Sequence, residues 1–173
     1  MSNYREFLKD IKAFVFDVDG VFTDGKVFIL PDGSQIRNMN VKDGYAVHYA
    51  SKKGYPIGII TGAKCDSLRI RFNELGLFDI YLASPDKLVD FNHCLTKYSL
   101  KPEEIMYMGD DLPDVKVMEQ VILPACPSDA CEEVKAISKY ISYAIGGNGC
   151  VRDIIEQTLK VQGKWLDKDA FVW

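Results

Sequence analysis

A short apolar segment followed at once by two aspartates constrains this chain more than any other part of its sequence. Residues 13–16 read Ala-Phe-Val-Phe, which predicts a buried β-strand, and Asp17 and Asp19 follow directly. In an open parallel sheet, ligands bind at the carboxyl ends of the strands, so both aspartates lie where chemistry is usually carried out. Two carboxylates this close repel each other unless a cation lies between them or one is protonated. The segment therefore predicts the first strand of an α/β fold with a functional site at its end.

Two other interpretations of the segment 17–20, Asp-Val-Asp-Gly, compete with a functional loop. Asp and Gly both favour turns, so an isolated Asp-x-Asp-Gly is compatible with an ordinary turn. A calcium loop would need Asp or Asn at its fifth position and Gly at its sixth, where this chain has Val21 and Phe22. A calcium loop would also follow a helix instead of a strand. It is therefore excluded, and the choice between a turn and a functional loop depends on the rest of the chain.

The composition indicates one globular domain over residues 1–173. An apolar fraction of 47% with mixed charges is typical of a soluble protein that builds its own core. No apolar run reaches membrane-spanning length and the first residues lack signal-peptide character, so we expect a cytoplasmic protein without membrane contact. A net charge of −4 argues against nucleic acid as a partner. The five cysteines are odd in number and lack a Cys-x-x-Cys pair, which favours buried thiols over a disulfide framework or a zinc site.

Short apolar segments alternate with helical patterns along the chain. Further strands are predicted at 56–60, 80–82, 105–108 and 121–123. Helices are predicted from 43 to about 53, from 66 to 75, from 87 to about 98, from 113 to 118, from 131 to 137 and from 151 to 160. The alternation predicts a Rossmann-like three-layer α/β sandwich with a mainly parallel sheet.

Two segments lie outside this alternation. Residues 26–40 read as a β-hairpin inserted after the first strand, and it is so apolar that we expect a neighbouring subunit to cover it. The tail, about 161–173, is expected to be irregular. The hairpin and one helix already fill the interval between Asp19 and Thr61, and the interval from Thr61 to Lys87 is short, so neither holds a separate cap domain.

Acidic residues return after the fourth predicted strand, in the segment Gly109–Asp114. Because the carboxyl ends of parallel strands meet at one edge of the sheet, we expect Asp110 to lie near Asp17 and Asp19. Mg²⁺ binds one or two carboxylates together with waters and substrate oxygens, so these three aspartates are the candidate metal positions. Asp111 and Asp114 are expected to support them. Alone, such an acidic segment often marks a helix N-terminus.

Candidate phosphate-binding groups follow the two intervening strands. Thr61 and Gly62 come directly after the second strand, and Lys87 comes shortly after the third. A hydroxyl, an ammonium group and loop amides are the donors that a phosphoryl group needs. Asp17 is then placed to attack phosphorus as a carboxylate nucleophile, and Asp19 to act as general acid and base. All of these groups follow strands, and together they favour the active site of a phosphotransferase over an ordinary turn at residues 17–20.

These motifs resemble those of the haloacid dehalogenase superfamily of phosphotransferases. The matching elements are Asp17-Val18-Asp19, Ile60-Thr61-Gly62, Lys87 and Gly109–Asp114. The nine residues from Asp17, DVDGVFTDG, the hairpin, and GGNGCVRD at 146–153 narrow the resemblance to the capless subfamily of 3-deoxy-D-manno-octulosonate 8-phosphate (KDO 8-phosphate) phosphatases.

The resemblance implies Mg²⁺-dependent hydrolysis of a sugar-acid phosphate monoester, most simply KDO 8-phosphate, as part of lipopolysaccharide biosynthesis. It implies that Asp19 gives its backbone carbonyl to Mg²⁺ while its side chain performs the acid–base chemistry. It also implies a homotetramer in which the hairpin and the C-terminal tail of one subunit cover the active site of a neighbour.

One departure from the family pattern concerns the substrate. The family often has Arg directly after the Thr-Gly pair, where this chain has Ala63. Phosphatases of the nine-carbon acid 2-keto-3-deoxynonulosonate 9-phosphate (KDN 9-phosphate) differ near this position, so that ester is the alternative substrate. Arg71 and Arg152 are candidate partners of the substrate carboxylate, and for each a purely structural role is the alternative. A catalytically inert domain that binds a phosphometabolite is the non-enzymatic alternative, which the intact acids disfavour.

Overall fold

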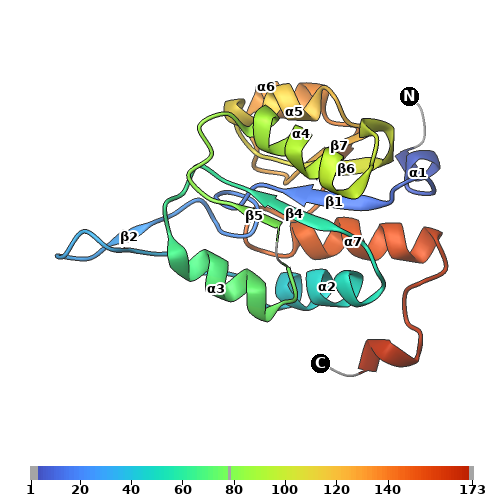
Figure 1. Ribbon diagram of the computed structural model, residues 1–173, viewed down its shortest axis with the longest axis horizontal. Helices are drawn as coiled ribbons and strands as arrows, with labels where there is room; N and C mark the ends of the chain where they lie inside the picture. Colours follow the sequence, from blue (N-terminus) through green and yellow to red (C-terminus); the bar gives the residue numbers. More distant parts are fainter. Residues whose placement is uncertain (1–3, 78, 172–173) are drawn as a thin grey trace.

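A sheet of six parallel strands separates two layers of helices (Figure 1). In the computed structural model, which describes residues 4–77 and 79–171, the strand order is β5 (Asp79–Tyr81), β4 (Ile57–Ile60), β1 (Ala13–Phe16), β6 (Ile105–Met108), β7 (Leu123–Cys126) and β8 (Tyr140–Ile141). All five pairings are parallel. One layer contains α2 (Val41–Lys52), α3 (Asp66–Glu74) and α7 (Cys150–Val161); the other contains α4 (Lys87–Tyr98), α5 (Val115–Met118) and α6 (Glu132–Ile137). The predicted three-layer α/β sandwich is confirmed.

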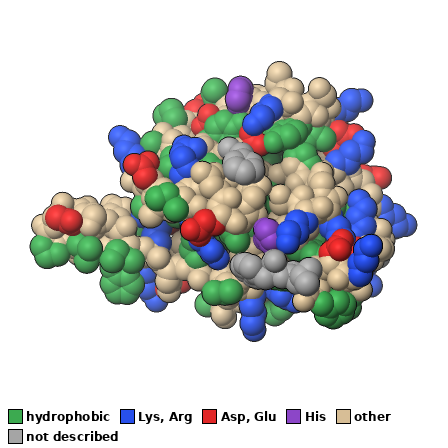
Figure 2. All heavy atoms as spheres, turned by 60° about the horizontal axis from the view of Figure 1, so that its bottom comes forward, with side chains coloured by type: hydrophobic (Ala, Val, Ile, Leu, Met, Phe, Trp, Pro, Cys, Tyr) green, Lys and Arg blue, Asp and Glu red, His purple; other side chains and the backbone are tan. Residues whose placement is uncertain are grey.

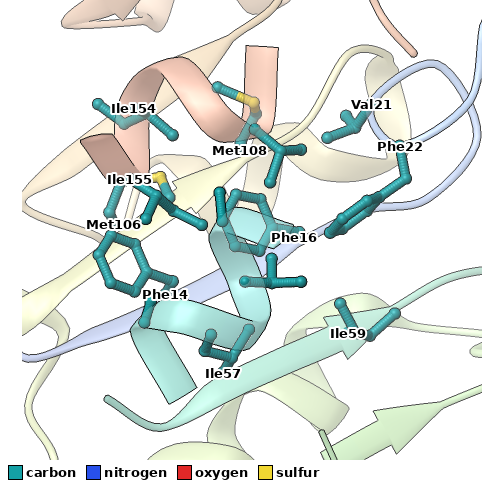
Figure 3. Close-up of a cluster of buried hydrophobic side chains, with 14 of the residues drawn as sticks. Phe14, Phe16, Val21, Phe22, Ile57, Ile59, Met106, Met108, Ile154 and Ile155 are labelled. Atoms are coloured by element: carbon teal, nitrogen blue, oxygen red, sulfur yellow. The ribbon is translucent and has the colours of Figure 1, made fainter. Parts of the chain in front are cut away.

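Strand β1 is buried on both faces because it lies between β4 and β6 and carries only apolar side chains. Side chains alternate along a strand, so Phe14 and Phe16 join the core under α2 and α7, whereas Ala13 and Val15 join the core under α4 and α5. Figure 3 shows the first of these cores, with the two phenylalanines between the isoleucines of β4 and the methionines of β6. Because both faces of β1 are packed, the end of this strand at Phe16 has a fixed position. Asp17 follows Phe16 directly and is therefore held in place as well.

Helices α2 and α7 pack closely, and a buried carboxylate links them. Asp43, in the first turn of α2, accepts hydrogen bonds from the backbone N–H groups of Gly149 (3.1 Å) and Arg152 (2.7 Å) at the start of α7. Burial raises the pKa of Asp43 to about 6 although these two amides act in the opposite direction. The first turn of α7 is thus held by α2 as well as by its own backbone.

The glycine-rich loop before α7 lies against the loop after β1. A Cβ atom on Gly146 would lie 2.0 Å from the carbonyl oxygen of Gly20, so only glycine permits this approach. The Gly147 amide also donates to the carbonyl of Val21 at 2.9 Å. Gly146 and Gly147 are therefore required for the packing of these two loops.

The hairpin extends from the body of the molecule on the left of Figure 1. Its two strands, β2 (Phe28–Ile29) and β3 (Gln35–Ile36), are antiparallel. Phe28 and Ile29 are 62% and 73% exposed, and Figure 2 shows hydrophobic side chains gathered on this arm. The hairpin predicted over 26–40 is confirmed, and the apolar side chains on it are uncovered in the single chain.

Several predicted boundaries differ from those observed. Helix α2 begins at Val41, two residues earlier than predicted, because the Asn40 side chain accepts from the Lys42 amide as an N-cap. The strand predicted at 121–123 lies instead at Leu123–Cys126; it contains Pro124, a residue that usually ends a strand prediction. The short α1 (Tyr4–Phe7) and β8 were not predicted.

The tail packs against its own chain over the described residues. Tyr49 of α2 donates to the Lys164 carbonyl at 3.0 Å and to the Asp167 carboxylate at 2.8 Å, and Trp165 lies edge-on to the Tyr49 ring. A 3₁₀ turn, η3 (Lys168–Phe171), follows. Most of the tail is irregular, as predicted, and its last two residues lie outside the described part.

Two expectations from composition can be compared with the described residues. Among them, no helix is long and apolar enough to cross a membrane. All five cysteines are free thiols, and Cys94, Cys126 and Cys150 are buried. Cys65 and Cys131 are partly exposed, so the prediction of buried thiols is wrong for these two.

Candidate active site

A pocket of about 690 Å³ opens at the carboxyl edge of the sheet. Loops that follow four different strands line it: Asp17 and Asp19 after β1, Thr61 after β4, Ser84 and Lys87 after β5, and Asp110 after β6. The strands bring together residues that are up to about 90 positions apart, as the parallel arrangement requires.

Three carboxylates converge on the floor of this pocket. One oxygen each from Asp17, Asp110 and Asp114 lies within 4.8 Å of the other two. The Lys87 ammonium lies 2.9 Å from Asp17 Oδ1 and 2.7 Å from Asp114 Oδ1, and all three of these side chains are buried. Asp110 makes no salt bridge with any described residue. The cluster therefore holds three acids and one compensating cation.

The excess of negative charge in this cluster shifts the pKa values of its members. Burial, followed by the nearby carboxylate of Asp114, raises the pKa of Asp17 to about 7. Burial, followed by Asp17 and Asp114, raises the pKa of Asp110 to about 8. Burial opposes the charged form of Lys87, but the two carboxylates outweigh it and raise the pKa of the ammonium. Both Asp17 and Asp110 would ionise more readily beside a second cation.

A divalent cation fits this donor set. Mg²⁺ is a hard cation that accepts carboxylate oxygens, and Asp17 and Asp110 supply two that no fixed positive charge fully neutralises. Asp114 is in the same oxygen cluster, but its oxygens are already engaged: Oδ1 accepts from Lys87 and from Tyr107 at 2.5 Å, and Oδ2 from the Asp110 amide at 3.2 Å. Asp17 and Asp110 would hold the metal, and Asp114 would support them.

The remaining acids lie at the edge of the cluster. Asp111 is exposed, and its side chain accepts from the Leu112 amide as the N-cap of η2 (Leu112–Asp114). The side chain of Asp19 is outside the group of converging oxygens and is 35% exposed. A metal contact through the Asp19 backbone carbonyl stays a prediction.

Asp19 is held on two sides. Arg37, directly after the outgoing strand β3 of the hairpin, contacts both its oxygens: Nε lies 2.7 Å from Oδ1 and Nη2 lies 3.0 Å from Oδ2. The Thr23 hydroxyl donates to Oδ1 at 3.4 Å and accepts from the Gly25 amide at 3.2 Å. The hydrogen bond to Asp19 raises the pKa of Arg37, and the Cys65 thiol adds to this effect. Asp19 therefore has a fixed orientation beside the pocket.

Donors for an anion surround the opening of the pocket. Thr61 is buried, and its hydroxyl accepts from the Ala63 amide at 3.2 Å, which leaves the hydroxyl proton available. Gly62 also lines the pocket and has no side chain, and the Lys87 ammonium supplies a positive charge. The hydroxyl oxygen of Ser84 is buried and has no hydrogen-bond partner among the described residues. These groups suit an oxyanion such as phosphate.

Neither candidate carboxylate partner lies in the pocket of this chain. Arg71 forms a long salt bridge of 3.6 Å with Glu74 on α3. Arg152 binds Glu156 at 3.1 Å, and its guanidinium lies over the rings of Tyr45 and Trp165. Their assignment to the substrate carboxylate stays a prediction.

Three residues of the site were not predicted. Ser84 follows a strand, as do the predicted site residues, so the same pattern could have indicated it. Tyr107 lies inside an apolar strand, where its hydroxyl gives no signal, and Arg37 lies on the hairpin, outside the alternating pattern. Their contacts depend on the tertiary structure.

Comparison with known proteins agrees with this arrangement. The profile of the haloacid dehalogenase-like hydrolases matches residues 63–152. The chain is 35% identical over 156 residues to the 3-deoxy-D-manno-octulosonate 8-phosphate phosphatase KdsC of Salmonella typhi, which covers 90% of this chain and 83% of that protein. The match to KdsC of Escherichia coli K12 has the same identity and coverage.

Crystal structures of such phosphatases share the fold. One from Moraxella catarrhalis, in complex with magnesium ion, phosphate ion and a KDO molecule, superposes with a TM-score of 0.91 at 32% identity over 95% of both chains. One from Yersinia pestis gives 0.90 at 33% identity, over 92% of this chain and 86% of that one. The fold and the site thus define a haloacid dehalogenase-like hydrolase without a separate cap among the described residues. Within that superfamily, the chain belongs to the KdsC family of KDO 8-phosphate phosphatases.

Gly20 tests the geometry of the acidic cluster. A Cβ atom there would lie 1.9 Å from Asp110 Oδ2, and Gly20 has a φ of +80°. Gly54 has a similar φ of +85°, but no atom lies within 4 Å of the corresponding Cβ position. Gly20→Ala should weaken Mg²⁺ binding at least about tenfold, because Asp110 must move, whereas Gly54→Ala should lose only about 1 kcal/mol of stability.

Isothermal titration calorimetry with Mg²⁺ and thermal unfolding of both variants measure these effects. Equal Mg²⁺ affinities for Gly20→Ala and Gly54→Ala would show that Asp110 is not a metal ligand in the position described.

Proposed function

We propose that this chain is a Mg²⁺-dependent phosphatase that hydrolyses KDO 8-phosphate to KDO and phosphate through Asp17. The observation that carries the proposal is the buried Asp17–Lys87–Asp114 cluster, with Asp110 beside it, on the floor of the pocket. The relative from Moraxella catarrhalis has the same fold, and its structure contains magnesium, phosphate and KDO.

Asp17 acts first as the nucleophile. Its carboxylate attacks phosphorus, the bond from phosphorus to the sugar oxygen breaks, and an aspartyl phosphate forms. Lys87 holds one Asp17 oxygen at 2.9 Å and is thereby placed beside the transferring group. The Thr61 hydroxyl and the Gly62 loop donate to the other phosphate oxygens. When bound, Mg²⁺ offsets the repulsion between the Asp17 carboxylate and the phosphate anion.

Asp19 moves the protons. In its carboxylic acid form it gives a proton to the departing sugar oxygen, which leaves as an alcohol. The resulting carboxylate then takes a proton from a water molecule as that water attacks the phosphorus of the aspartyl phosphate. Phosphate departs, and Asp17 is restored. Asp19 lies at the edge of the pocket and is partly exposed, so it can reach both the leaving group and a water.

Ala63 favours one alternative substrate. It lines the pocket at the position where the family often carries Arg. The smaller, uncharged side chain leaves space and removes a cation near the sugar-acid end, so KDN 9-phosphate is the second candidate. The charge that would hold the substrate carboxylate then comes from another residue, for which Arg71 and Arg152 stay candidates.

The apolar arm supports a proposed assembly. Five apolar side chains of the hairpin, Val27, Phe28, Ile29, Leu30 and Ile36, are exposed. An isolated two-stranded hairpin with such a surface gains stability when it packs against another protein surface. We propose a cytoplasmic homotetramer in which the arm covers a neighbouring pocket, because among the described residues no cap domain of the same chain excludes water from it. Release of KDO would serve lipopolysaccharide biosynthesis.

The substrate is tested by phosphate release from KDO 8-phosphate and KDN 9-phosphate under identical conditions. We expect kcat/KM to favour KDO 8-phosphate by about 10–100-fold, a range that a pocket reaches by fit alone. Excess EDTA should abolish turnover, and added Mg²⁺ should restore it. A preference for KDN 9-phosphate would assign the alternative substrate. No turnover of either ester would contradict a sugar-acid phosphate as the substrate.

The nucleophile is tested in the same assay with Asp17→Asn. The amide cannot attack phosphorus, so kcat should fall by at least about 10³-fold, within the range that covalent catalysts lose on removal of the nucleophile. Asp32→Asn, on the exposed hairpin tip, is the matched control and should keep full activity. Unchanged turnover in Asp17→Asn would exclude Asp17 as the nucleophile.

The assembly is tested by light scattering of the double variant Phe28→Ser, Ile29→Ser. We expect four chains per particle in the wild type and fewer in the variant, since the apolar contact is lost. Val89→Ser is the control, because Val89 is as exposed as Phe28 but lies on α4. A variant that stays tetrameric would show that the arm does not hold the assembly together.

A further inference from the structure

Arg37 is buried although the arm that carries it is exposed. Its neighbours Gln35 and Ile36 face solvent, whereas only 6% of the Arg37 side chain is accessible. The side chain therefore runs from the base of the hairpin back into the body of the protein. This arrangement anchors the arm at the active-site pocket.

The guanidinium meets Asp19 in a two-point contact. Nε and Nη2 bind different oxygens of the same carboxylate, at 2.7 and 3.0 Å. A planar fork of this kind fixes the rotation of the carboxylate as well as its position, which a single ammonium does not do. The Thr23 hydroxyl completes the contacts on Oδ1. Asp19 consequently cannot turn away from the pocket without breaking at least two charged hydrogen bonds.

The third nitrogen of Arg37 does not bind Asp19. Nη1 is buried and has no hydrogen-bond partner among the described residues. Asp19 and the nearby Cys65 side chain both raise the pKa of Arg37 and so favour its charged form. The two contacts through Nε and Nη2 are therefore the ones that hold Asp19.

We infer that Arg37 is a positioning residue for the reaction: its guanidinium fixes the rotation of the Asp19 carboxyl group toward the leaving sugar oxygen, to which Asp19 in its acid form gives a proton. This inference rests on the proposed function, in which Asp19 is the general acid. Arg37 itself touches neither the phosphate-binding groups nor the acidic cluster. Because it lies on the hairpin, it also connects the conformation of the arm with the orientation of Asp19.

The test exploits how strongly different leaving groups need a proton. The departing sugar alkoxide is strongly basic and must be protonated, whereas p-nitrophenolate leaves with little assistance. The value of kcat/KM reports the steps up to release of the alcohol, so it isolates the transfer in which Asp19 is the acid. Arg37→Gln should therefore lower kcat/KM about 100-fold for the sugar-acid phosphate and less than about threefold for p-nitrophenyl phosphate.

Two further variants control for charge and folding. Arg37→Lys keeps a charge that can bind one oxygen of Asp19, and it should recover to within about tenfold of the wild type. Lys26→Gln removes a cation from the same arm without contact to Asp19 and should act as the wild type does. Light scattering and thermal unfolding of Arg37→Gln establish that the assembly and the fold persist.

Two results would overturn the inference while leaving the proposed function intact. These are full activity of Arg37→Gln toward the sugar-acid phosphate, or equal losses of kcat/KM with both esters. Equal losses would indicate a general structural brace or a role in binding the phosphate. A wild-type protein that hydrolyses neither ester would instead overturn the proposed function, and the inference with it.

Discussion

Repulsion among three converging carboxylates, two buried and one partly exposed, is the constraint on which the site depends. Asp17, Asp110 and Asp114 place oxygens within 4.8 Å of one another, and Lys87 is the ammonium group that bonds two of them. Carboxylates this close destabilise the folded state unless cations compensate for them. The fold tolerates the cluster because each acid follows or adjoins a strand whose position is set by a separate, well-packed core. Stability is thus supplied by the sheet, and the edge of the sheet is free to hold an unfavourable arrangement of charge that a metal and a phosphate can use.

The loops at this edge are held by close backbone contact. Gly20 makes room for the Asp110 carboxylate, and Gly146 makes room for the Gly20 carbonyl, so the loop after β1 packs closely against the loops after β6 and before α7. Beyond them, the hairpin reaches the site through Arg37, which contacts Asp19. The candidate catalytic groups thus follow well-packed strands, whereas Asp19, the proposed acid–base residue, also binds a residue of the exposed arm.

The sequence predicted the parts of the molecule that follow from local pattern. Alternating apolar segments gave the parallel sheet, and polar residues after each strand gave Asp17, Thr61, Lys87 and Asp110. The extent of the strand at Leu123–Cys126 was missed because it depends on pairing with β6 and β8, not on its own composition. Arg37 was missed because its partner, Asp19, is distant in sequence. Tyr107 was missed because it lies inside an apolar strand, where a hydroxyl is not expected to reach the site. The placement of Arg71 and Arg152 outside the pocket likewise follows from packing that no local pattern encodes.

Thermal unfolding of the wild type and of Asp110→Asn, at pH 9 with and without Mg²⁺, tests most directly whether the cluster is built for a divalent cation. At that pH Asp110 is ionised despite its raised pKa of about 8, so its repulsion with Asp17 is fully present. Without Mg²⁺, Asp110→Asn should unfold at a higher temperature than the wild type, because one charge has been removed. With Mg²⁺ the order should reverse, since only the wild type gains stability from the bound ion. An equal response of the two proteins to Mg²⁺, or a metal-free Asp110→Asn less stable than the wild type, would contradict a cluster of mutually repelling carboxylates that binds the metal.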